Sequence, residues 1–220
     1  MASQVKSKER VSDFGEVFTN EREVNAMLDL VKEETENIDS TFLEPACGDG
    51  NFLCEILKRK LSICKDRYSK IPDNYEKFSI IAVTSLYGVD ILEDNVDACR
   101  KRLYKIWEEE YKKICKKYED ENCKAACKYI LSKNILCGDA LTLLKNDGTP
   151  IVFPEWKLVS GNLIKRRDYE FAKLLEVDQK QIDMFWLLDG WEYDEETKRY
   201  IPAPIKEYSL IDYKKVMELE

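Results

Sequence analysis

Four polar side chains follow short apolar runs that have the composition of buried strands, and their types suit the binding of a polar ligand. The runs are residues 41–43, 86–89, 134–137 and 156–159, and the side chains that follow them are Glu44, Asp90, Asp139 and Asn162. In an open α/β sheet, ligands bind beyond the carboxyl ends of the strands. We therefore expect the three carboxylates and the amide to gather along one rim of a sheet.

A turn with two glycines joins the first run to a helical pattern. The string E-P-A-C-G-D-G at 44–50 contains Gly48 and Gly50, and a helix with one apolar face is expected after it. Glycine lets a ligand approach the backbone closely, although many such turns are only tight connections. An acid at the end of the following strand commonly accepts hydrogen bonds from ribose hydroxyls, which predicts this role for Asp90. The alternative is that Asp90 belongs to the start of the helix expected near Asp94.

The elements that must position these side chains alternate between strands and helices along the chain. This alternation predicts an α/β fold with a mostly parallel, doubly wound sheet. Asn20, followed by two glutamates, predicts the start of an amphipathic helix. We expect a loop over 71–77, a charge-rich helical insertion or protruding hairpin over about 108–130, and strands that end at the four polar positions.

The predicted domain organisation has three parts. Residues 1–12 form a flexible N-terminal tail, residues 13–175 form the main domain, and residues 176–220 form a C-terminal extension.

Composition excludes several classes of function. The 220 residues include no histidine, which excludes Ser–His and Cys–His nucleophile pairs and the commonest general base. The net charge of −8 argues against tight DNA binding by the chain alone. The eight cysteines lack the spacing of known zinc sites, so we expect no metal and interpret them as small buried apolar side chains. Since neither a secretory signal nor a long apolar run is present, we expect a cytoplasmic protein without a membrane span.

Four strings in the chain resemble the S-adenosylmethionine (SAM) binding motifs of the N6-adenine DNA methyltransferases of restriction–modification systems. They are F-G-E-V-F-T at 14–19, L-E-P-A-C-G-D-G-N-F-L at 43–53, Y-G-V-D-I at 87–91 and C-G-D-A-L at 137–141, in the same order as in that family. The resemblance covers roughly residues 13 to 170. It implies a Rossmann-like SAM-dependent methyltransferase fold with SAM as the cofactor.

The resemblance also implies roles for individual residues. The cofactor-binding set would be Phe18, Thr19, Glu44, Pro45, Ala46, Cys47, Gly48, Gly50, Phe52, Asp90, Ile91, Asp139 and Ala140. Within this set, Phe18 and Thr19 would close over the methionine end of SAM, Asp90 would hold the ribose hydroxyls, and Asp139 would contact the adenine edge.

The catalytic motif of that family is Asn or Asp, then two prolines and an aromatic residue, and it implies that Asn162 is the catalytic residue. The side chain would accept hydrogen bonds from the target amine. This chain has N-L-I-K at 162–165, so both prolines are absent and Lys165 replaces the aromatic residue. Tyr169 is the candidate for stacking on a flipped base. Lys165, Arg166 and Arg167 could contact DNA phosphates, or they could form the solvated start of a helix.

These expectations lead to one function and two alternatives. The first is methylation of adenine N6 in DNA, with a specificity or nuclease partner subunit supplying target recognition, because the chain has no recognisable target-recognition domain. One alternative is a catalytically inactive SAM-binding subunit that serves assembly or regulation. The other is a methyltransferase for protein glutamine or RNA, since related catalytic motifs serve those substrates.

Overall fold

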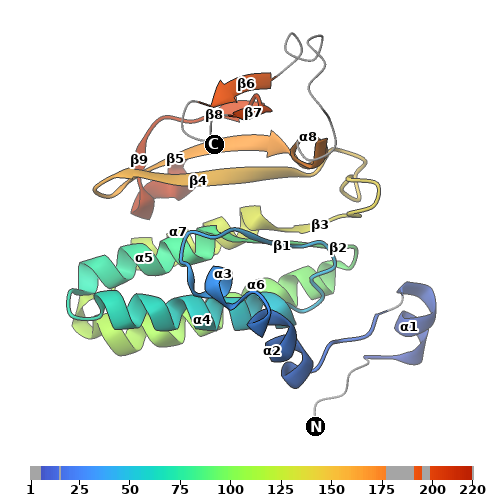
Figure 1. Cartoon of the computed structure of the whole chain (residues 1–220), viewed down its shortest axis with the longest axis horizontal. Helices are drawn as coiled ribbons and strands as arrows, with labels where there is room; N and C mark the ends of the chain where they lie inside the picture. Colours follow the sequence, from blue (N-terminus) through green and yellow to red (C-terminus); the bar gives the residue numbers. More distant parts are fainter. Residues whose placement is uncertain (1–5, 15, 177–190, 195–198, 220) are drawn as a thin grey trace.

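A computed structural model describes residues 6–14, 16–176, 191–194 and 199–219, and it has a mixed α/β fold (Figure 1). Its centre is a three-stranded parallel sheet with the order β1-β2-β3. The strands are β1 (Phe42–Glu44), β2 (Leu86–Asp90) and β3 (Ile135–Cys137). These are the first three strands that the sequence predicts, and they end at or just before the predicted polar residues.

Two pairs of helices connect the parallel strands. The helices α4 (Asn51–Tyr68) and α5 (Pro72–Thr84) join β1 to β2, and α6 (Glu93–Cys115) and α7 (Glu121–Asn134) join β2 to β3. Crossovers between parallel strands are almost always right-handed. Because the three strands follow one another in a single direction across the sheet, both crossovers lie on the same face (Figure 1). The prediction of a doubly wound sheet is therefore wrong for the described residues.

The opposite face of the parallel sheet is covered by a separate antiparallel sheet (Figure 1). A long hairpin of β4 (Val152–Ser160) and β5 (Leu163–Glu170) forms most of it, and β8 (Lys206–Glu207) and β9 (Ile211–Asp212) pair with β5. The fourth predicted strand thus exists, but it pairs antiparallel with β5 and does not join the parallel sheet. Because β8 and β9 also pair with β5, part of the predicted C-terminal extension continues this sheet.

Three smaller elements complete the C-terminal part. The helix α8 (Phe171–Glu176) follows β5, and β6 (Trp191–Asp194) and β7 (Arg199–Pro202) form a two-stranded sheet of their own. The short helix η3 (Tyr213–Glu218) packs on α7.

The helical hairpin of α6 and α7 belongs to the core, which corrects the prediction of an insertion or protrusion there. A short turn, η1 (Lys116–Tyr118), connects the two helices. Tyr111, Cys115, Cys123 and Cys127 lie on their inner faces and are buried. The many charged residues of this stretch occupy the outer faces, where several form ion pairs three or four positions apart.

Two further sequence-based expectations are corrected in the N-terminal half. Residues of the predicted tail form the helix α1 (Lys8–Phe14), and the predicted loop over 71–77 is the first half of α5, with Pro72 in the first turn. The predicted helix start at Asn20 is confirmed, because its side chain accepts a hydrogen bond from the Glu23 backbone as α2 (Glu21–Asp29) begins. The short helix α3 (Lys32–Glu36) precedes β1.

The core confirms the interpretation of the cysteines. All eight are free thiols, and all but Cys137 are buried. Among the described residues, no group of histidine, cysteine or acidic side chains is arranged to hold a metal ion. None of the described helices is both long enough and apolar enough to cross a membrane.

Candidate functional site

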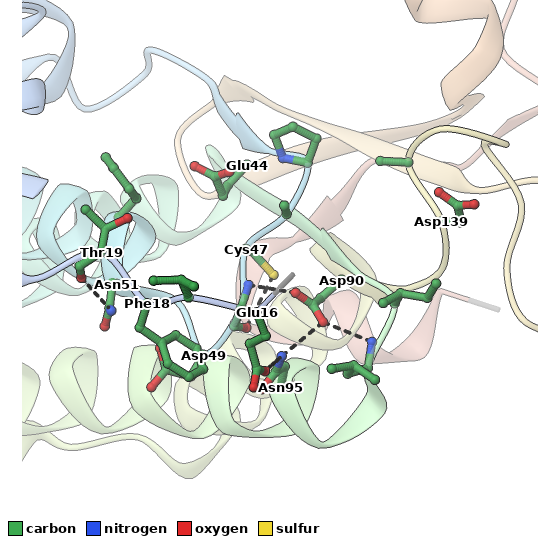
Figure 2. Close-up of a pocket in the computed structure, with 18 of the residues that line it drawn as sticks. Glu16, Phe18, Thr19, Glu44, Cys47, Asp49, Asn51, Asp90, Asn95 and Asp139 are labelled. Atoms are coloured by element: carbon green, nitrogen blue, oxygen red, sulfur yellow. Dashed lines mark hydrogen bonds between the residues drawn. The ribbon is translucent and has the colours of Figure 1, made fainter. Parts of the chain in front are cut away.

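A pocket of about 610 Å³ lies at the carboxyl ends of β1, β2 and β3 (Figure 2). Four segments line it: 16–19 before α2, 44–52 around the glycine turn, 90–95 at the start of α6, and 138–141 after β3. Every residue of the predicted cofactor-binding set lines this pocket except Gly50. The sequence-based expectation that Glu44, Asp90 and Asp139 gather on one rim is therefore confirmed.

The carboxylate of Asp90 accepts hydrogen bonds from three donors, namely two backbone N–H groups and one side-chain amide. Its Oδ2 atom accepts a hydrogen bond of 2.9 Å from the backbone N–H of Gly48. Its Oδ1 atom accepts hydrogen bonds from the backbone N–H of Leu92, at 2.9 Å, and from Nδ2 of Asn95, at 3.2 Å. Asp90 thus lines the pocket and also binds the residues that begin α6, whereas its role toward a ribose stays a prediction.

The two glycines of the turn have different reasons to be glycine. Gly48 and Gly50 both have positive φ angles, of +53° and +92°. A Cβ on Gly48 would lie 3.1 Å from the Phe18 ring across the pocket wall, whereas a Cβ on Gly50 would lie 2.6 Å from Sγ of Cys99 in the core. Gly48 therefore lets the Phe18 ring lie close to the turn, and Gly50 permits α4 to pack closely on α6.

The lining of the pocket carries more negative than positive charge. Its lining contains five carboxylates, and no lysine or arginine lines it within the described part of the chain. Two of the carboxylates have cationic partners: Asp49 pairs with Arg102 at 2.7 Å, and Glu16 pairs with Arg10 at 2.7 Å. Burial raises the pKa of Glu44, against a smaller opposing effect of a backbone hydrogen bond from Ala46. Such a pocket favours a ligand with cationic groups and disfavours one with phosphates.

Eight residues of the lining are absent from the predicted set, and the side chains of three of them form hydrogen bonds with other lining residues. Glu16 lies inside the F-G-E-V-F-T string, so its place in this string could have predicted that it lines the pocket. Asn51 donates from Nδ2 to the carbonyl oxygen of Thr19 at 3.0 Å and so ties the wall at 16–19 to α4. Asn95 lies where the sequence predicts only the start of a helix, near Asp94, but its side chain donates to both Glu16 and Asp90 (Figure 2).

Asn162, the predicted catalytic residue, lies outside this pocket. It occupies the turn of the β4–β5 hairpin, at the end of the hairpin opposite to β3 and the loop that follows it (Figure 1). Its carbonyl oxygen accepts a hydrogen bond from the backbone of Tyr213, and Lys77 of α5 donates to the neighbouring carbonyl of Gly161 at 3.1 Å. The prediction that Asn162 shares a rim with Asp90 is wrong. The strand before Asn162, β4, pairs with β5 in the antiparallel sheet and does not join the parallel sheet that ends at Asp90.

The predicted basic cluster is paired within the antiparallel sheet. Arg166 is buried and donates two hydrogen bonds of 2.7 Å to the carboxylate of Asp168. Lys165 pairs with Glu207 at 2.7 Å, and Arg167 lies 3.6 Å from Glu155. All three residues belong to β5, so they do not begin a helix. Each also has an acidic partner, so they do not form a cluster of unpaired positive charges that is free to bind phosphates.

Tyr169, the candidate stacking residue, also lies outside the pocket that the cofactor-binding set lines. It is buried and lines a second cavity of about 410 Å³, with Leu43 of β1, Tyr87 of β2 and Leu174 of α8. The predicted substrate residues therefore do not come together around the pocket at the ends of the parallel strands.

Comparison of the chain with protein-family models, with curated proteins and with solved structures found no match.

Proposed function

We propose that this chain binds SAM in the pocket at the carboxyl ends of β1–β3. The observation that carries the proposal is the charge of the lining, with five carboxylates and, among the described residues, no lysine or arginine. SAM carries a sulfonium and an ammonium group, which such a lining attracts. Dinucleotides and nucleotides bind the same region of open sheets through phosphates, which this lining repels.

The arrangement of the strands supports a Rossmann-like methyltransferase fold. A doubly wound sheet has the order 3-2-1-4-5-6, and its ligand lies at the switch point beside strand 1. The order β1-β2-β3 with both crossovers on one face corresponds to one half of that sheet. In this interpretation Asp90, at the end of the second strand, holds the ribose hydroxyls, and Glu44, at the end of the first, faces the methionine ammonium.

The proposed substrate is the adenine amine of DNA. Its support is the order of the four strings at 14–19, 43–53, 87–91 and 137–141, all of which contribute residues to the pocket. Since Asn162 lies at the far end of the β4–β5 hairpin, the groups that hold the target amine come from a partner subunit in this proposal. That position of Asn162 also favours a second candidate function, a SAM-binding subunit that serves assembly and transfers no methyl group.

A calorimetric titration with SAM and with NAD tests the cofactor. We expect micromolar binding of SAM, binding of NAD at least about tenfold weaker, and a loss of SAM affinity of at least about tenfold in Asp90→Ala. The matched control is Asp97→Ala, an acid on the outer face of α6 that does not line the pocket. A folded protein that prefers NAD, or an Asp90→Ala variant that binds SAM normally, would contradict the proposal.

A methyl-transfer assay separates the candidate functions. Labelled SAM would be supplied to the chain, alone and together with any protein encoded next to it, and the label would be measured in DNA, RNA and protein fractions. Label in DNA supports the adenine methyltransferase, whereas SAM binding without transfer to any fraction supports the assembly subunit.

A further inference from the structure

A continuous chain of hydrogen bonds runs from helix α1 to the carboxylate of Asp90. Arg10 of α1 donates to Glu16 through Nε, at 2.7 Å, and through Nη2, at 2.8 Å. Asn95 then donates through Nδ2 to Glu16, at 2.7 Å, and to Asp90, at 3.2 Å. Figure 2 shows Glu16 next to Asn95, and a dashed line joins Asn95 to Asp90.

Asn95 is the buried link in this chain. It is only 1% exposed, and the Glu16 side chain is 7% exposed. The orientation of the Asn95 amide is fixed from the other side, since its Oδ1 accepts from Nη2 of Arg10 at 3.2 Å and from Nζ of Lys6 at 2.5 Å. An amide turned the other way would place its oxygen against two carboxylates and its NH2 group against two cations.

The same contacts attach α1 to the rest of the protein. Arg10 also donates to Asp94 at the start of α6, through Nη1 at 2.7 Å. Lys6 lies 5.4 Å from the centre of the Phe18 ring, which belongs to the pocket wall. The wall at 16–19 is therefore held between α1 on one side and Asn51 of α4 on the other.

We propose that Arg10 and Asn95 are positioning residues for Asp90, and that docking of α1 and occupancy of the pocket are coupled through them. The identity of the ligand rests on the proposed function, whereas the docking of α1 does not. With α1 docked, Arg10 neutralises Glu16, and Asn95 holds Oδ1 of Asp90 in place. Asp90 then meets the ribose hydroxyls without reorganisation. Coupling between two binding events is reciprocal, so a bound cofactor must also stabilise the docked α1.

Hydrogen–deuterium exchange over residues 8–14 tests the docking without any ligand. We expect exchange at least about tenfold faster in Arg10→Ala than in the unchanged protein, because the four hydrogen bonds from Arg10 to Glu16 and Asp94 are lost. Lys8→Ala is the matched control, since it removes one positive charge from the same helix and has no bond to the pocket. The double variant Lys6→Ala/Arg10→Ala also removes Lys6, the other cation that donates to Asn95. Equal exchange in the unchanged protein and the double variant would overturn the proposal.

Ribose discrimination tests the positioning role. The probes are S-adenosylhomocysteine and its 2′,3′-dideoxy analogue, bound to the unchanged protein, to Asn95→Leu and to Arg10→Ala. We expect the unchanged protein to prefer the ribose ligand by about tenfold or more, and both variants to lose most of that preference. Arg10→Lys should restore part of it. An equal loss of affinity for both ligands would show a merely structural role and overturn the proposal.

The two proposals fail in distinguishable ways. If neither SAM nor S-adenosylhomocysteine binds but exchange over 8–14 rises in Arg10→Ala, the cofactor assignment fails while the docking of α1 stands. If SAM binds and protects residues 8–14 equally in the unchanged protein and in Arg10→Ala, the coupling fails while the cofactor assignment stands.

Discussion

The backbone N–H of Gly48 donates a hydrogen bond of 2.9 Å to Oδ2 of Asp90, which joins the loop after β1 to the end of β2. Next to it, the backbone N–H of Cys47 donates to the carbonyl of Val89 at 2.9 Å. The pairing of β1 with β2 therefore continues past the end of β1 into the glycine turn. As a result, the turn and the acid have a fixed relative position before any ligand arrives.

The charge of Glu44 should distinguish SAM from its demethylated product. Glu44→Gln keeps the shape of the side chain and removes one charge from the lining. We expect SAM affinity to fall by about tenfold and S-adenosylhomocysteine affinity to fall less, because Glu44 attracts both positive charges of SAM, whereas the product keeps only the ammonium. Glu33→Gln, an exposed acid on α3, is the control. Calorimetry with both ligands measures the difference, and an identical loss for both would contradict the electrostatic argument.

Gly50→Ala should destabilise the protein more than Gly148→Ala does. Both glycines have similar positive φ angles, of +92° and +80°, so the backbone strain of about 1 kcal/mol is common to both variants. Only at Gly50 would the new Cβ meet Sγ of Cys99, at 2.6 Å, whereas nothing lies within 4 Å at Gly148. We expect a further loss of about 1–3 kcal/mol in the free energy of unfolding, measured in urea. Cys99→Ala combined with Gly50→Ala should recover part of it.

Lys60 should give the stability a specific pH dependence. Its Nζ is buried and donates to the carbonyl of Ile38 at 3.1 Å, to Oγ of Ser85 at 2.6 Å and to the carbonyl of Ser40. Burial lowers the pKa of Lys60 from 10.5 to about 8. Between about pH 8 and 10.5 the unfolded chain therefore binds a proton at Lys60 that the folded protein does not. The stability that this difference contributes is fully present above about pH 10.5 and is lost as the pH falls through about 8.

The measurement is the free energy of unfolding of the unchanged protein minus that of Lys60→Met, at each pH. Since one pKa unit corresponds to about 1.4 kcal/mol, this difference should rise by up to about 3 kcal/mol between pH 8 and 10.5. Subtraction removes the opposite trend expected from buried cysteines that do not interact with Lys60, for example Cys115, whose pKa burial raises to about 12. A flat difference would show that Lys60 keeps its ordinary pKa.

The ion pair of Arg166 and Asp168 should contribute to the stability of the fold and not to DNA binding. Asp168→Ala leaves the Arg166 guanidinium buried between the Trp156 and Tyr208 rings without its carboxylate partner. We expect a loss of about 3–5 kcal/mol in the free energy of unfolding, and a smaller loss for Arg166→Met combined with Asp168→Leu. Denaturation in urea measures both. A double variant that is less stable than Asp168→Ala would contradict this account.

The sequence was sufficient to predict the parallel strands and the pocket, because both depend on local patterns. Each strand is a short apolar run that ends at or before a polar residue, and the carboxyl ends of parallel strands meet at one edge. Gly48 and Asp90 belong to strings that are specific in composition and order. Such features need no knowledge of distant contacts.

The antiparallel layer was not predictable in the same way, because its buried face includes charged residues. Along β5 the buried positions of the inward face are Ile164, Arg166 and Asp168. Two of these three residues form an ion pair, so apolar residues do not alternate with polar ones as they do in a typical half-buried strand. The same reason explains the error at α5, where Glu76 is buried as the acceptor for Tyr111 and Tyr213. A sequence pattern assigns charged residues to the surface, and these pairings arise only from the tertiary structure.

The distribution of the thiols gives this protein a built-in reporter of its own unfolding. Cys137 alone is partly exposed, so a thiol-reactive dye should modify one site in the native state, and each further modification should require the core to open. Cys47 lies in the pocket lining as well as in the core. Its labelling rate therefore reports, at a single atom, both the local opening of the glycine turn and the shielding that a bound ligand would provide.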